Sequence, residues 1–150
     1  MYRMKVFMTH HAVTDLKIVP PFPPLVLVVE DDPLIALHLE DHLIDVGLRV
    51  LGPAASVKDA LELLVTRRPD VAVLDYNLQR GVVTKVAVRL SELGVPFVMS
   101  SACPPSSMTD VVFLDIENLG KPIAFENLDR ALRAILGRNC LYNSVTLPQK

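Results

Sequence analysis

Acidic side chains follow two apolar runs of this 150-residue sequence. Glu30, Asp31 and Asp32 come directly after the run LVLVV, and Asp75 ends the run DVAVLD. Carboxylates that lie close together repel each other and raise one another's pKa, unless a cation neutralises them. Mg²⁺ suits such a cluster because it takes hard oxygen ligands and needs only a few carboxylates. If the fold brings these acids together, they predict a magnesium site.

A hydroxyl and an ammonium stand at comparable places further along the chain. Ser101 ends the apolar run VPFVMSS, and Lys121 lies directly before Pro122. Beside a metal ion, one carboxylate of the cluster could attack phosphorus as a nucleophile, while the ion, the lysine and the hydroxyl spread the charge of the transferring group. This chemistry requires residues from distant parts of the chain to meet at one place.

Short β-branched runs that alternate with amphipathic stretches predict how these residues meet. The runs are apolar throughout, as strands covered by helices on both sides must be. Ligands of a parallel α/β sheet bind beyond the carboxyl ends of its strands, so the acids, Ser101 and Lys121 should converge on one edge. The predicted strands are 25–29, 48–52, 71–75 and 95–100, and the predicted helices are about 33–46, 56–66, 83–93 and 124–136.

The prolines of PPFPP, residues 20–24, predict a boundary, because proline lacks a backbone donor and resists both helix and central strand. They separate an N-terminal extension of unknown structure, residues 1–24, from one domain over residues 25–137, which a tail of residues 138–150 follows. Inside the domain, periodicity does not decide whether VVFLD, residues 111–115, is a strand or a buried helix.

Composition excludes several classes of protein. With 51% hydrophobic and 21% charged residues and a net charge of -2, the chain is predicted to be one globular domain without the basic footprint of a nucleic-acid binder. The longest apolar run, residues 18–29, contains four prolines and is too short to span a bilayer. Cys103 and Cys140 have no metal-ligand spacing and are interpreted as reduced thiols. We therefore expect a cytoplasmic protein that binds neither nucleic acid nor membrane.

Residues 25–137 resemble the receiver domain of two-component response regulators. LVVED is similar to the acidic pair of that family, VLDYN to its phospho-acceptor loop, MSSA to its switch hydroxyl and GKP to its lysine, which precedes a cis peptide bond. Asp31 and Asp75 are 44 positions apart (75 − 31), the usual distance in the family between a metal ligand and the phospho-acceptor. The resemblance implies a flavodoxin-like three-layer α/β sandwich with a five-stranded parallel sheet in the order 2-1-3-4-5.

The same resemblance implies a role for each site residue. Asp75 would be the phospho-acceptor, Ser101 would contact the phosphoryl group and Lys121 would pair with it. Asp32 would belong to the start of the first helix. The implied ligands of Mg²⁺ are Glu30, Asp31, Asp75 and the backbone carbonyl of Asn77.

The implied function is that of a single-domain response regulator rather than an enzyme. Such a protein takes a phosphoryl group from a sensor histidine kinase or a histidine phosphotransfer protein in a Mg²⁺-dependent reaction. It then signals or relays by contact with a downstream protein, which the sequence does not identify. Only 13 residues follow Gly137 (150 − 137), which we interpret as too few for a DNA-binding or enzymatic output domain.

Two departures from the family pattern concern signal output. Asn118 stands three residues before the lysine, where the family often has an aromatic ring, and CPPSS, residues 103–107, replaces the usual start of the fourth helix. Both departures predict a looser connection between Ser101 and the output surface. An unphosphorylated pseudo-receiver, which keeps the fold and acts as a binding module, is the main alternative function.

Other interpretations of single residues stay open at the level of sequence. The acids near residue 30 could simply favour the positive N-terminus of a helix, and Ser100 competes with Ser101 as the switch hydroxyl. A phosphatase with an aspartate nucleophile would need a second acid where Asn77 stands. His38 and His42 have the i, i+4 spacing of zinc ligands on a helix, but no third ligand is evident.

Overall fold

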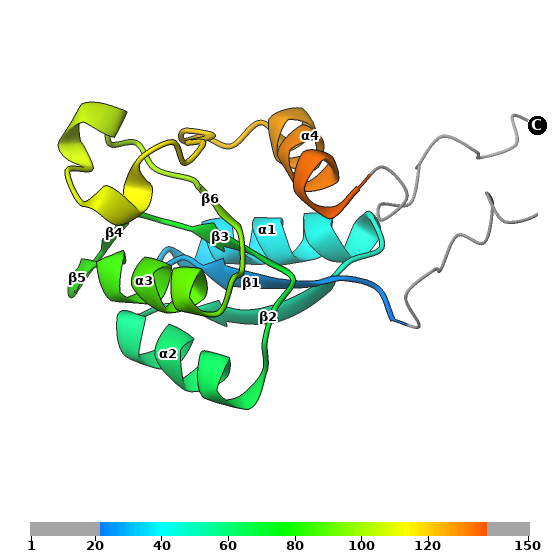
Figure 1. Cartoon of the computed structure of the whole chain (residues 1–150). Helices are drawn as coiled ribbons and strands as arrows, with labels where there is room; N and C mark the ends of the chain where they lie inside the picture. The colour runs from blue at the N-terminus through cyan, green and yellow to red at the C-terminus, as the bar shows by residue number, and fades with distance from the viewer. Residues whose placement is uncertain (1–21, 138–150) are drawn as a thin grey trace, which may run out of the picture.

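The computed structural model describes residues 22–137, in which a parallel sheet lies between two layers of helices (Figure 1). The four strands of the sheet follow the order β2-β1-β3-β6, and every pairing is parallel. Their bounds are Leu25–Val29 for β1, Arg49–Ala54 for β2, Val71–Leu74 for β3 and Phe97–Met99 for β6. The predicted three-layer α/β sandwich is therefore confirmed.

Two helices cover each face of the sheet. The helices α1 (Pro33–Asp45) and α4 (Phe125–Leu136) pack on one face, and α2 (Val57–Thr66) and α3 (Thr84–Glu92) pack on the other. All five residues of β1 are buried, because alternate side chains of this strand enter the two apolar cores on opposite faces. A central strand with both faces covered positions whatever follows it at the carboxyl edge.

The start of α1 is set by Asp32. Its carboxylate accepts hydrogen bonds from the backbone N–H groups of Leu34, at 2.9 Å, and of Ile35, at 3.2 Å. This side-chain cap satisfies two of the N–H groups that the first turn of a helix leaves without an intrahelical partner. The prediction that Asp32 belongs to the helix start, and is distinct from the pair before it, is confirmed.

The predicted five-stranded sheet is confirmed only in part, because four of its strands form and the place of the fifth holds no regular strand in the described chain. Beyond β6 there is one parallel bridge, between Met99 and Asn118. The segment can pair only briefly because its backbone turns at both ends, at Asp115 with φ 63° and at Gly120 with φ 77°. Pro122, which has no N–H to donate, follows shortly after. The order of the four observed strands agrees with the prediction.

Two short 3₁₀ turns lie between β6 and α4, where the family pattern has a helix. They span Pro105–Ser107 and Val111–Phe113, so VVFLD is neither the strand nor the buried helix between which periodicity did not decide. Phe113 is buried against the core that α2 and α3 cover, and its ring meets Tyr76 edge-on with the centroids 5.4 Å apart.

After β3 the chain forms a two-residue hairpin of β4 (Asn77–Leu78) and β5 (Gly81–Val82). Within residues 22–137, every helix is too short or too polar to cross a membrane. The predicted extension and tail lie largely outside the described residues, since only positions 22–24 of residues 1–24 and none of residues 138–150 are described.

Candidate functional site

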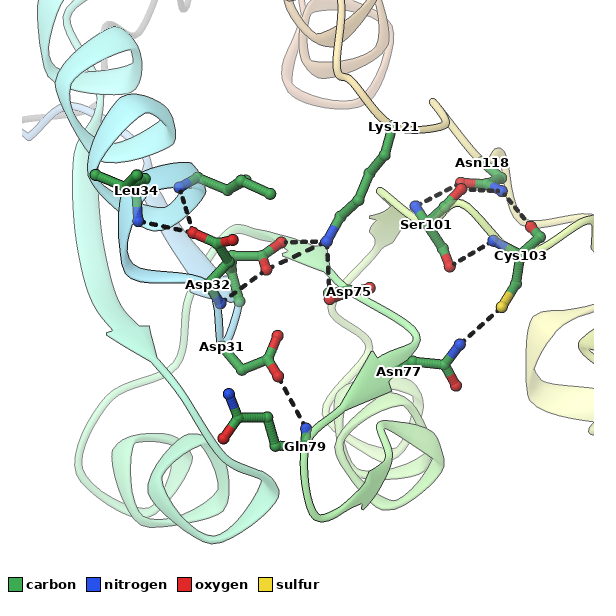
Figure 2. A network of polar contacts seen from close by, with 12 residues as sticks. Asp31, Asp32, Leu34, Asp75, Asn77, Gln79, Ser101, Cys103, Asn118 and Lys121 are labelled. Carbon is green, nitrogen blue, oxygen red and sulfur yellow. Dashed lines mark hydrogen bonds and ion pairs between the residues drawn. The ribbon is translucent and has the colours of Figure 1, made fainter.

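A cavity of about 400 Å³ opens at the carboxyl edge of the sheet, where β1, β3 and β6 end (Figure 2). Four segments of the chain reach this edge, namely the residues that follow β1, β3 and β6 and the loop before α4, as the alternation of strands and helices predicted. All the residues predicted for the site line this one cavity, namely Glu30, Asp31, Asp75, Asn77, Ser101 and Lys121. Ser100 does not line it, which favours Ser101 among the two neighbouring hydroxyls.

Lys121 connects two buried carboxylates. Its Nζ lies 2.9 Å from Oδ2 of Asp75 and 2.9 Å from Oε2 of Glu30. Burial would lower the pKa of this lysine, but its hydrogen bonds to Asp75 and Glu30 outweigh burial and raise the pKa above the ordinary value of 10.5. The ammonium is therefore charged at neutral pH. The peptide bond between Lys121 and Pro122 is cis, as the resemblance implied.

Glu30 is the more deeply buried of the two partners, with 2% of its surface exposed against 4% for Asp75. Burial raises the pKa of Glu30 above the ordinary 4.5, although hydrogen bonds from Lys121 and from the backbone N–H of Asp32 oppose the shift. The nearby charge of Asp75 raises this pKa further. One lysine shared by two carboxylates thus leaves an excess of negative charge in a buried place.

Asp31 adds a third carboxylate to this place. One oxygen each from Glu30, Asp31 and Asp75 lie within 4.8 Å of one another. Asp31 is half-buried, and its Oδ2 accepts a hydrogen bond of 2.9 Å from the backbone N–H of Gln79, in the β4–β5 turn. Three hard oxygen donors with an excess of negative charge fit a divalent cation of the Mg²⁺ type. Within residues 22–137 this is the one cluster of acidic, histidine or cysteine side chains suited to a metal ion.

The Ser101 hydroxyl lies at the opposite side of the cavity. The residue is 3% exposed, and its Oγ accepts a hydrogen bond of 3.1 Å from the backbone N–H of Cys103. A serine hydroxyl can accept two hydrogen bonds and donate one, so this contact leaves its proton free to donate. The thiol of Cys103 lies 2.7 Å from the side-chain nitrogen of Asn77.

Sequence reasoning missed the part that Asn118 takes in this site. Its amide makes hydrogen bonds with the backbone of Ser101, Cys103 and Gly120 (Figure 2). The looser connection expected at this position concerns the response to phosphorylation and stays a prediction, while in this structure two hydrogen bonds join the Asn118 amide to the backbone of Ser101. An asparagine in a short polar turn has no sequence signal that would distinguish it from a surface residue.

The two histidines considered for zinc do not form a site with each other. His42 stacks on Phe125, with the ring centroids 4.1 Å apart, and its Nε2 lies 2.7 Å from Oδ1 of Asp129. His42 therefore connects α1 to α4, and the structural interpretation of this histidine is the one that its contacts favour. His38 is exposed.

Known protein sequences match this chain only over part of their length. No family model matches the sequence. A protein-glutamate methylesterase/protein-glutamine glutaminase of Syntrophus aciditrophicus is 34% identical over 96 residues, which cover 61% of this chain and 27% of that protein. The transcriptional regulatory protein PdtaR of Mycobacterium tuberculosis is 33% identical over 58 residues, covering 39% of this chain and 28% of that protein. The matches therefore span little more than a quarter of the length of these relatives.

Solved structures match over most of the described chain. The BeF3-activated conformation of SdrG from Pseudomonas melonis Fr1 is 35% identical, with a TM-score of 0.64 over 77% of this chain and 98% of that chain. The receiver domain of PhyR from Erythrobacter litoralis is 24% identical, with a TM-score of 0.67 over 77% of this chain and 91% of that one. A CheY-like receiver domain from Methylobacillus flagellatus, also 24% identical, has a TM-score of 0.65 over 75% and 98%.

Proposed function

Because the chain belongs to the receiver-domain family of response regulators and has its flavodoxin-like fold, we propose that it accepts a phosphoryl group on Asp75. The observation that carries this proposal is the position of Lys121, whose ammonium lies between the carboxylates of Asp75 and Glu30 while Asp31 completes an acidic trio. A carboxylate beside a charged ammonium and a divalent-cation site is suited to attack phosphorus.

The donor that we propose is the phosphohistidine of a sensor histidine kinase or a histidine phosphotransfer protein. An oxygen of Asp75 forms a bond to phosphorus, the bond from phosphorus to the imidazole nitrogen breaks, and its electron pair returns to that nitrogen. The product is an acyl phosphate. The Lys121 ammonium then pairs with the new phosphoryl oxygens, and the Ser101 hydroxyl donates a hydrogen bond to one of them.

The residues that would hold Mg²⁺ are Glu30, Asp31, Asp75 and the backbone carbonyl of Asn77. When bound, the ion would neutralise the excess negative charge of the carboxylates and of the transferring oxygens. The three carboxylate oxygens within 4.8 Å of one another support this assignment for the acids. For Asn77, the support is its place on β4 beside the same cavity.

We further propose that the chain works as a signalling module in the cytoplasm and not as an enzyme. It would act as a single-domain response regulator, passing its signal or its phosphoryl group to a downstream protein by direct contact. An unphosphorylated pseudo-receiver is the competing function, and it shares the fold but not the chemistry of Asp75.

The test is labelling of the purified chain with acetyl phosphate in the presence of Mg²⁺. Wild-type protein should gain a hydroxylamine-labile phosphoryl group, and Asp75→Asn should gain none, because the amide is nearly isosteric but a poor nucleophile. Asp45→Asn makes the same chemical change at an exposed position at the end of α1 and should label like wild type. Equal labelling of Asp75→Asn would disprove the acceptor, and an unlabelled wild-type protein would favour the pseudo-receiver.

A further inference from the structure

The side-chain amide of Asn118 uses its entire hydrogen-bonding capacity on the backbone of two loops (Figure 2). Its nitrogen donates to the carbonyl of Ser101, at 3.1 Å, and to that of Cys103, at 3.2 Å. Its oxygen accepts from the N–H of Ser101, at 3.0 Å, and from that of Gly120, at 3.1 Å. An amide offers two protons and one oxygen with two lone pairs, so no capacity is left.

These four bonds take the place of strand pairing. The edge of β6 that faces away from β3 pairs only at the bridge between Met99 and Asn118, because no regular fifth strand lies beside it in the described chain. In the loop after β6, the amide of Asn118 bonds to the backbone of Ser101 and Cys103. We call this set of four hydrogen bonds the Asn118 clamp.

The Asn118 clamp acts on the two segments that carry Ser101 and Lys121, which line the same cavity as Asp75. It holds the N–H and the carbonyl of Ser101, while Cys103, held by the same amide, donates its own N–H to the Ser101 hydroxyl. At its other end it holds Gly120, the residue directly before Lys121. The backbone of Ser101, which carries the hydroxyl, and the backbone next to Lys121, which carries the ammonium, are thus bonded to the Asn118 side chain.

We propose that Asn118 is a positioning residue for phosphoryl transfer, which fixes Ser101 and Lys121 relative to Asp75 before the phosphoryl group arrives. This inference rests on the proposed function of Asp75. Catalysis gains when donors are already in place and need not reorganise during the reaction. Asn118 touches none of the three carboxylates proposed to bind Mg²⁺, so its role separates from metal binding.

The clamp requires an amide because it needs two donated and two accepted hydrogen bonds from one side chain. Leucine has the same branched arrangement of side-chain heavy atoms as asparagine, with bulkier ends, and makes none of the four bonds. Aspartate keeps the two accepting bonds but loses both donors, and it would place a carboxylate against the carbonyls of Ser101 and Cys103. The two substitutions therefore remove the whole clamp and half of it.

The experiment measures the rate constant of labelling by acetyl phosphate at saturating Mg²⁺ and, separately, the Kd for Mg²⁺. Asn118→Leu should lower the rate constant about tenfold, which corresponds to one lost interaction of ordinary strength in the transition state. Asn118→Asp should also lower the rate constant, because it loses both donated bonds and repels the two carbonyls, and the Kd for Mg²⁺ should stay within about twofold for both variants. Glu117→Gln, a control in the same segment whose side chain pairs with Arg130 at the surface, should label like wild type.

A double variant separates positioning from general damage. In a Ser101→Ala background, Asn118→Leu should reduce the rate constant much less than it does alone, because three of the four clamp bonds hold the loop that carries Ser101 and only one holds Gly120 beside Lys121. Fully additive losses, or wild-type rates in Asn118→Leu, would overturn the proposal. A parallel loss of Mg²⁺ affinity would overturn it too. If wild-type protein takes no label at all, the proposed function itself fails, which is a distinct result.

A measurement on the unmodified chain covers the case in which Asn118→Leu does not fold. The side-chain amide protons of Asn118 should be protected from exchange with water, as hydrogen-bonded protons are, both before and after addition of Mg²⁺ and beryllofluoride. Rapid exchange of these protons in the free protein would contradict a clamp that exists before the phosphoryl group arrives.

Discussion

The ammonium of Lys121 lies 2.9 Å from the carboxylate of Asp75, across a site that is buried on the acidic side and 20% exposed at the lysine. The same ammonium also contacts Glu30, so one cation stabilises two carboxylates that are almost removed from solvent. This shared position makes the metal-free site sensitive to the loss of one charge.

Lys121→Ala should lower the free energy of unfolding of the metal-free chain by about 3 kcal/mol at pH 7, because removal of one partner leaves buried carboxylates without a counter-charge. Mg²⁺ should restore part of this loss, since it neutralises the same acids. Urea unfolding with and without Mg²⁺ measures both effects. Lys58→Ala, which removes an exposed ion pair to Glu62, should change the free energy of unfolding by less than about 0.5 kcal/mol.

Glu30→Gln should change how stability depends on pH. Burial raises the pKa of Glu30 above 4.5 in the folded chain, so between 4.5 and the raised value the folded state binds more protons than the unfolded state. The free energy of unfolding of metal-free wild type should therefore contain a term that falls as pH rises through this window and is constant above it. Glu30→Gln lacks this term. Urea unfolding of both proteins from pH 4 upward tests the difference, and equal pH profiles would contradict the raised pKa.

Asp31→Ala should weaken Mg²⁺ binding, whereas Asp32→Ala should lower the stability of the fold. Asp31 belongs to the acidic trio, so its loss should weaken Mg²⁺ binding by tenfold or more, about 1.4 kcal/mol. Asp32 caps α1, so its loss should cost about 1 kcal/mol of stability with little effect on Mg²⁺. Calorimetric titration and urea unfolding measure the two quantities. A stronger loss of Mg²⁺ binding in Asp32→Ala would shift the metal assignment by one residue.

His42→Ala should destabilise the chain by about 1 to 2 kcal/mol, because it removes the contact with Asp129 and the stacking on Phe125 between α1 and α4. Labelling by acetyl phosphate should persist in this variant wherever it is folded. His38→Ala, at an exposed position on the same helix, should leave stability nearly unchanged. A strong effect of zinc on the stability of wild type that both substitutions abolish would revive the metal interpretation of the pair.

Local pattern was enough to predict the scaffold of the site. The apolar run that forms β1 and the capping aspartate that begins α1 act within a few residues, so their effects can be read directly from the chain. Parallel strands place their carboxyl ends at one edge whatever the connections between them, which is why Glu30, Asp75 and Ser101 could be predicted to meet.

Tertiary structure decided the features that depend on pairing between distant segments. Whether a fifth strand forms depends on turns at Asp115 and Gly120, which bend the backbone away from β6 on both sides of a single bridge. Asn118 becomes a clamp only because that bridge brings it within 3.0 Å of the backbone of Ser101, 17 positions earlier in the chain. An amide has no preference of its own for such a partner, so its role is determined by the position that the fold imposes on it.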